Sequence, residues 1–111
     1  GVTYSNDAKM AVLGVKKETI IKYGAVHEQT AKEMAKGARR ICGADLAVST
    51  TGIAGPTGGT KDRPVGMVCI GLASDTVTTA KTVTFSLDDR MLNKKVFAAT
   101  ALETLRRHLL K

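Results

Sequence analysis

Aromatic residues are scarce in this sequence of 111 residues, which has no Trp, two Tyr and two Phe. We therefore expect an aliphatic core built from Val, Ile, Leu, Met and Ala. Long hydrophobic runs are also missing, and none approaches the roughly 20 residues that a membrane-spanning helix needs. These absences argue against a transmembrane helix and favour one small cytoplasmic domain over residues 1–111.

Cysteine and histidine are equally sparse, with two residues of each. Cys42 and Cys69 lack the C-x-x-C or Cys/His spacing of a metal site, and His27 and His108 have no paired ligand at metal-binding spacing. Each cysteine falls within an apolar pattern, so we expect two buried free thiols in a reducing compartment. The sequence predicts neither a metal ion nor a cofactor.

Basic residues outnumber acidic ones by 17 to 10, which gives a formal net charge of +7. Such an excess favours anionic partners such as nucleic acid, phosphate or acidic lipid. The paired basic residues stand at separate positions of the expected helices, namely Lys16-Lys17, Arg39-Arg40, Lys94-Lys95 and Arg106-Arg107. They are either solvated helix faces or contacts for an anion. No aromatic residues alternate with them, which argues against a single-stranded nucleic acid, and we expect no membrane partner.

The N-terminal half has a helical pattern. Ser5 or Asn6 can cap a first short helix that Gly14 ends, and "KKETIIKYG" predicts a second helix that ends at Gly24. Residues 28–42 predict a longer amphipathic helix, closed by Gly43. Its apolar positions recur at a spacing of three and four: Ala31, Met34, Ala35, Ala38, Ile41 and Cys42.

The second half predicts three strands and a last helix. Residues 45–51 and 65–74 are near-continuous apolar runs, typical of buried strands, and 78–86 alternates as a half-exposed strand paired with the preceding one. The last helix begins at Asp88 or Asp89 and carries one expected core stripe, formed by Leu92, Val96, Ala99, Leu102, Leu105 and Leu109. This order of elements predicts an α/β fold, a three-layer sandwich with a mixed β-sheet flanked by helices.

Glycines and both prolines of the chain gather between the first two strands, in "TTGIAGPTGGTKDRPVG" at residues 50–66. The spacing is not that of a phosphate-binding P-loop, and the segment leads into a strand rather than a helix. Glycines at this position let backbone N–H groups approach a ligand, and Thr50 and Thr51 add hydroxyl groups at the end of the strand. The segment is either a binding loop or a mobile connection.

Lys9 lies near the start of the first helix, one turn from Ser5 and close to Tyr4. A lysine acts as a general base only where burial or neighbouring cations lower its pKa substantially. On the pattern alone, Lys9 is either such a base or an exposed surface charge.

The stretches "VTYSNDAKMAVLGV", "YGAV", "STTGIAGPTGGT" and "RPVG" resemble, in order and separation, the C-terminal domain of the CinA family of competence/damage-inducible proteins. The resemblance covers nearly the whole chain. It implies a three-layer α/β domain that is usually dimeric. It also implies a nicotinamide mononucleotide deamidase of the pyridine nucleotide cycle, an amidohydrolase that forms nicotinate mononucleotide and ammonia.

The resemblance also implies roles for particular residues. Family members use a serine nucleophile and a lysine base, and the matching lysine is Lys9, with Tyr4 as a second catalytic residue. The backbone N–H groups of the glycine segment would stabilise the oxyanion, and Arg90 would hold the nucleotide phosphate. The implied substrate-binding residues are Ser5, Asn6, Thr51, Gly52, Gly55, Gly58, Gly59 and Arg90.

Three features of the sequence depart from the family pattern. The motif that carries the serine nucleophile belongs upstream of this chain, so we expect a fragment that lacks the N-terminal part of the family domain and is incomplete for catalysis alone. "FSLDDR" lacks the glycine usual before Asp-Arg, and His27 stands where a serine cap is common. Two alternatives remain open: a non-catalytic nucleotide- or protein-binding accessory domain linked to competence, and general nucleic-acid binding through the net charge.

Overall fold

The computed structural model describes residues 9–10, 13–53, 59–61, 63–85 and 90–109. Its elements are α2 (Lys17–Tyr23), α3 (Glu28–Cys42), β1 (Leu46–Gly52), β2 (Met67–Ser74), β3 (Thr78–Thr84) and α4 (Arg90–Leu109). The predicted order of helices and strands is confirmed. Residues 9–10 and 13 are helical where the first helix was expected, and the caps predicted at Ser5 and Asn6 lie outside the described residues.

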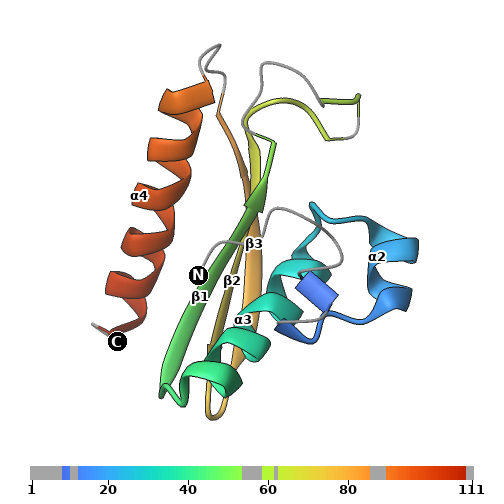
Figure 1. The fold of residues 1–111 in the computed structure, drawn as a ribbon. Helices are drawn as coiled ribbons and strands as arrows, with labels where there is room; N and C mark the ends of the chain where they lie inside the picture. Colours follow the sequence, from blue (N-terminus) through green and yellow to red (C-terminus); the bar gives the residue numbers. More distant parts are fainter. Residues whose placement is uncertain (1–8, 11–12, 54–58, 62, 86–89, 110–111) are drawn as a thin grey trace.

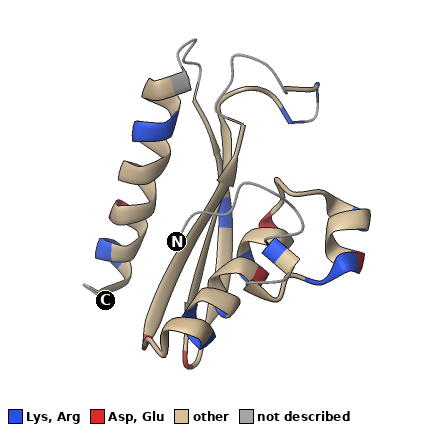
Figure 2. Ribbon diagram, viewed as in Figure 1, with Lys and Arg blue, Asp and Glu red and all other residues tan. Residues whose placement is uncertain are grey.

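The sheet lies between two helical layers, with α2 and α3 on one face and α4 on the other (Figure 1). Its strand order is β1-β2-β3, and both pairs are antiparallel. The predicted three-layer α/β sandwich is therefore confirmed, and the described strands contain no parallel pair. Basic residues occur on helices of both outer layers (Figure 2). No helix in the described part of the chain is long and apolar enough to cross a membrane.

The central strand β2 is buried on both sides, as its continuous apolar sequence predicts. On one side it meets α3 at Gly71, where a Cβ atom would lie 2.2 Å from the carbonyl oxygen of Ala31. The Ser49 hydroxyl donates a hydrogen bond of 2.6 Å to the same oxygen. Glycine at position 71 thus lets the helix backbone approach the sheet closely.

Both ends of α3 have a defined cap. The Nδ1 atom of His27 accepts a hydrogen bond of 3.0 Å from the backbone N–H of Gln29, and Gly43 ends the helix in the left-handed conformation. The predicted apolar face is buried up to Ala35. Cys42 is exposed, so the prediction of two buried thiols is wrong for this residue, whereas Cys69 is buried. The last turn of α3 lies near one end of the sheet, beyond most of its contact area (Figure 1).

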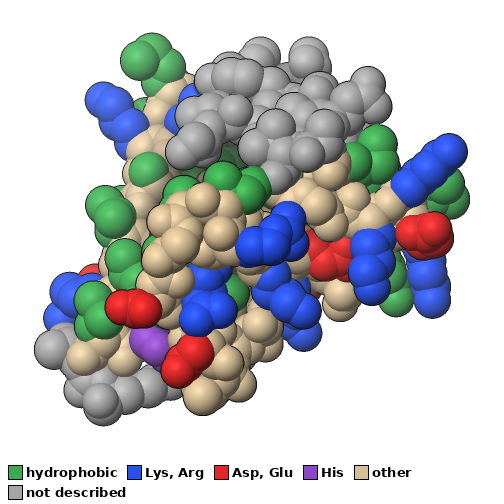
Figure 3. Space-filling view, turned by 60° about the horizontal axis from the view of Figure 1, so that its bottom comes forward, with side chains coloured by type: hydrophobic (Ala, Val, Ile, Leu, Met, Phe, Trp, Pro, Cys, Tyr) green, Lys and Arg blue, Asp and Glu red, His purple; other side chains and the backbone are tan. Residues whose placement is uncertain are grey.

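The buried row of α4 is Asn93, Phe97 and Ala101, so the predicted stripe is wrong. Met91 is 69% exposed and Leu102 65% exposed. Of the predicted stripe, Leu92, Ala99, Leu102 and Leu109 are exposed, and Val96 and Leu105 are half-buried. Hydrophobic side chains accordingly line the α4 side of the surface (Figure 3). The helix is apolar on two faces, and the face that carries the aromatic ring meets the sheet, where Phe97 packs in one cluster with Val68 and Ile70.

We predict that His27→Ala lowers the stability of the domain by about 1 kcal/mol relative to His27→Ser, because only serine retains a cap acceptor for α3. Both variants lose the stacking of the His27 ring on Tyr23, whose centroids lie 4.3 Å apart, so their difference isolates the cap. Thermal unfolding should give a Tm about 4 °C lower for the alanine variant. Equal melting of the two variants would show that the cap contributes nothing.

Candidate functional site

Four consecutive backbone carbonyl groups, at residues 23–26 between α2 and α3, accept hydrogen bonds from three side chains. Arg63 donates to the carbonyl oxygens of the first and last of these residues, the latter through Nε at 2.8 Å. The hydroxyl of Thr30 donates to the second carbonyl at 2.6 Å, and that of Thr51 to the third at 2.8 Å. This segment therefore ties together α3, the end of β1 and the glycine-rich loop.

Arg63 connects the glycine-rich loop to this segment. Its backbone N–H donates to the Thr60 hydroxyl at 3.0 Å, and its carbonyl accepts from the Thr60 N–H at 2.8 Å. The described part of the loop, residues 59–61 and 63–66, accordingly leans to the α2/α3 side of the sheet (Figure 1). Arg63 belongs to the family stretch "RPVG", and no role was predicted for it from the sequence. An arginine inside a glycine-rich loop was the available signal.

The predicted loop residues that the structure describes have packing roles. Thr51 is buried, and its hydroxyl is engaged with Ala25. A Cβ atom at Gly52 would lie 2.7 Å from the carbonyl oxygen of Met67 and from the Phe97 ring, and one at Gly59 would lie 2.7 Å from the nitrogen of Val65. Side chains are therefore excluded at both glycines by close neighbours.

Lys9 is buried, with 6% of its surface exposed. Burial lowers the pKa of its ammonium group from the ordinary value, because a low-dielectric environment disfavours the charged form. Of the two interpretations of Lys9, the exposed surface charge is therefore excluded. The direction of this shift is the one that a general base requires.

The remaining predicted site residues lie outside the described part of the chain. They are Tyr4, Ser5, Asn6, Gly55, Gly58 and the side chain of Arg90, whose backbone begins α4. The helical turn at residues 9–10 lies on the α2/α3 side of the sheet, the side toward which the loop leans (Figure 1). A cavity shared by Lys9 and the loop stays a prediction.

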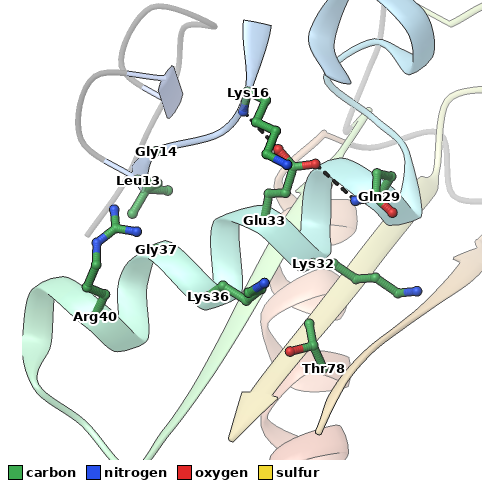
Figure 4. Close-up of a pocket in the computed structure, with 10 residues that line it drawn as sticks. All are labelled: Leu13, Gly14, Lys16, Gln29, Lys32, Glu33, Lys36, Gly37, Arg40 and Thr78. Atoms are coloured by element: carbon green, nitrogen blue, oxygen red, sulfur yellow. Dashed lines mark hydrogen bonds between the residues drawn. The ribbon is translucent and has the colours of Figure 1, made fainter. Parts of the chain in front are cut away.

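A hollow of about 330 Å³ lies elsewhere, along the outer face of α3. None of the predicted site residues that the structure describes lines it, and its charged walls come mainly from α3 (Figure 4). Among the described residues, no group of His, Cys, Asp or Glu side chains is arranged to hold a metal ion.

Comparison with known proteins identifies close relatives. The chain is 56% identical over 110 residues to a "CinA-like protein" of Desulfosudis oleivorans, covering 99% of this chain and 27% of that protein. It is 49% identical to a "Putative competence-damage inducible protein" of Clostridium perfringens, covering 99% of this chain and 26% of that protein. The chain thus spans about a quarter of the length of these curated relatives.

Solved structures agree with this relationship. The crystal structure of the competence/damage inducible protein CihA from Agrobacterium tumefaciens matches with a TM-score of 0.91 and 40% identity, over 96% of this chain and 65% of that one. A CinA superfamily protein from Escherichia coli matches with a TM-score of 0.87 and 32% identity, over 94% of this chain and 60% of that one.

The family model described as the CinA C-terminal domain matches residues 1–109, nearly the whole chain. Because this match covers nearly the whole chain and agrees with the relatives above, the chain belongs to the CinA C-terminal domain family.

Proposed function

We propose that the intact protein that contains this domain hydrolyses the carboxamide of nicotinamide mononucleotide to nicotinate mononucleotide and ammonia. The observation that carries the proposal is the burial of Lys9, at the position where the resemblance places the catalytic base. Burial favours the neutral amine, which alone can accept a proton.

In the proposed reaction, the neutral amine of Lys9 accepts the proton of the serine hydroxyl that the resemblance places upstream. The serine oxygen attacks the carboxamide carbon, and the resulting tetrahedral oxyanion is stabilised by backbone N–H groups of the glycine-rich loop. The Lys9 ammonium then gives its proton to the leaving nitrogen, and ammonia departs. Lys9 then takes a proton from a water molecule that attacks the acyl carbon, and it gives this proton to the serine oxygen as nicotinate mononucleotide leaves. The reaction is an acyl transfer to water and needs no redox cofactor.

Binding and assembly complete the proposal. Arg90 would hold the nucleotide phosphate, with Ser5, Asn6 and the loop glycines at the rest of the substrate, and Tyr4 would assist Lys9.

We also propose a homodimer, which the resemblance implies, and light scattering on the intact protein tests it. The uncovered apolar residues of α4 are a kind of surface that often packs against further protein.

We predict that Lys9→Ala in the intact protein lowers the rate of ammonia release from nicotinamide mononucleotide by about 10² to 10⁴, the usual range for loss of a general base. Lys17→Ala is the matched control, because this lysine of α2 is exposed, and its activity should equal that of the wild type. Near-normal turnover by the Lys9 variant contradicts its role as base. Calorimetry that shows nucleotide binding without any turnover by the wild type instead favours the non-catalytic binding domain.

A second prediction concerns stability and pH. The pKa of Lys9 is lowered by burial below its ordinary value of 10.5, so the unfolded chain binds more protons between these two pKa values. Folding is therefore penalised at low pH, and the penalty disappears as the pH rises past the unfolded value. We expect Lys9→Met to be more stable than the wild type near pH 7, with the difference shrinking toward pH 11. Urea unfolding of both proteins across this pH range measures the difference in stability. A difference that does not change with pH contradicts the lowered pKa of Lys9.

A third prediction concerns Arg63. Arg63→Lys replaces a guanidinium that reaches two carbonyl groups by an ammonium that cannot span both in the same fork geometry. We expect a rise in KM for the nucleotide of about tenfold or more, because the loop loses its fixed position. Arg39→Lys is the control, since Arg39 also donates to a carbonyl oxygen, that of Asp45, at the other end of α3. Equal KM values for both variants would exclude a positioning role for Arg63.

A further inference from the structure

The hollow along the outer face of α3 is walled by cations (Figure 4). Lys32, Lys36 and Arg40 follow one another at intervals of four residues, which places them on one face of the helix. Lys16 lies on the opposite wall, in the segment that precedes α2. Lys and Arg side chains also gather over the middle of the surface seen from the lower end of the molecule (Figure 3).

Three of these cations have no ion-pair partner in the described part of the chain, whereas Lys16 interacts electrostatically with Glu33. No ion pair joins Lys32, Lys36 or Arg40 to a carboxylate among the described residues, where the ion pairs found belong to Glu103 on α4. Arg40 is held close to the opposite wall, since a Cβ atom at Gly14 would lie 2.8 Å from its guanidinium. The hollow is therefore a concentration of positive charge that a bound anion would stabilise.

Glu33 is the one acidic side chain among the described residues that line this hollow, and its oxygens are engaged. Oε1 accepts from the Lys16 N–H at 2.8 Å, and Oε2 accepts from the Thr19 hydroxyl at 2.6 Å and the Gln29 amide at 3.0 Å. Burial alone would raise the pKa of Glu33, but these hydrogen bonds outweigh it and lower the pKa. Glu33 thus fixes the wall that carries Lys16 and is not available to occupy the hollow.

A second hollow of about 240 Å³ shares Lys36 and Thr78 with the first, and its other charged lining residues are Arg39 and Asp75. Lys32 and Arg40 lie eight residues apart, which corresponds to about 12 Å along the helix axis. One phosphate group would meet only part of this row of cations, whereas a chain of phosphoryl groups matches its length. Among the described residues that line the two hollows none is aromatic, so these residues offer no stacking platform for bases.

We propose that this groove, lined by Lys16, Lys32, Lys36 and Arg40, binds a compact polyphosphate chain of about three phosphoryl groups, either inorganic or the tail of a nucleoside triphosphate. The described residues that line the groove include none of those assigned to deamidation, and the inference does not depend on the proposed function.

The test is calorimetric titration of the intact protein with sodium tripolyphosphate, ATP and AMP at one fixed ionic strength. The groove variant is Lys32→Gln with Lys36→Gln. The matched control is Lys94→Gln with Lys95→Gln, which removes the same charge from exposed positions on α4. We expect tripolyphosphate affinity to fall at least about tenfold in the groove variant and by less than about twofold in the control, because direct charge-assisted contacts are lost only in the former.

The titrations with tripolyphosphate and ATP distinguish an inorganic polyphosphate ligand from the tail of a nucleoside triphosphate. Equal affinity for tripolyphosphate and ATP means that phosphoryl groups alone are recognised, and tighter binding of ATP assigns the site to a nucleotide tail. The proposal is overturned if the wild type binds tripolyphosphate no better than AMP, if both variants lose affinity equally, or if a single-stranded oligonucleotide binds the groove more tightly than either polyphosphate. Ammonia release should be unchanged in the groove variant, which keeps this result distinct from failure of the deamidase proposal.

Discussion

The arrangement of this domain depends on satisfying the backbone carbonyl groups of residues 23–26. The chain leaves α2 at Gly24 and enters α3 at Glu28, so these carbonyls lie outside the helical hydrogen-bonding pattern. A partly buried carbonyl without a donor costs about 1–3 kcal/mol. Thr30, Thr51 and Arg63 supply the donors from three different parts of the chain. The glycine-rich loop is therefore fixed relative to α2 and α3 by the same bonds that satisfy this connection.

A second close contact holds the segment before α2 against α3. A Cβ atom at Gly37 would lie 1.7 Å from the carbonyl oxygen of Leu13, so only glycine permits this approach. The backbone of this segment is closed by a hydrogen bond from the Val15 N–H to the Lys9 carbonyl at 3.2 Å. The contact places the segment as one wall of the cationic groove. The same stretch, residues 9–16, thus contributes both the buried Lys9 and the Lys16 that faces the groove.

Local pattern was enough to predict the elements but not which surfaces meet. Caps and turn glycines such as Gly24 and Gly43 mark helix ends chemically, and the unbroken apolar sequence of β2 marks a strand covered on both faces. The α4 sequence has apolar residues on two faces, and periodicity alone does not show which face packs on the sheet. Phe97 packs there because Gly52, distant in the sequence, leaves space for its ring. The burial of Lys9 and the contact of Arg63 with two carbonyl groups likewise depend on residues that are distant in the sequence. The site was predictable in residue types and spacing, and its geometry was not.

The two chemistries assigned to the α2/α3 side require opposite environments. A base must be able to stay neutral, and burial lowers the pKa of Lys9. An anion site must keep its lysines charged, and Lys36 and Arg40 are exposed to water. Interactions between exposed charges farther apart than about 10 Å are largely screened at ordinary salt, whereas desolvation is local to the buried group. Because burial distinguishes the two sites, one small domain can hold an amine of lowered pKa and a row of solvated cations on neighbouring segments.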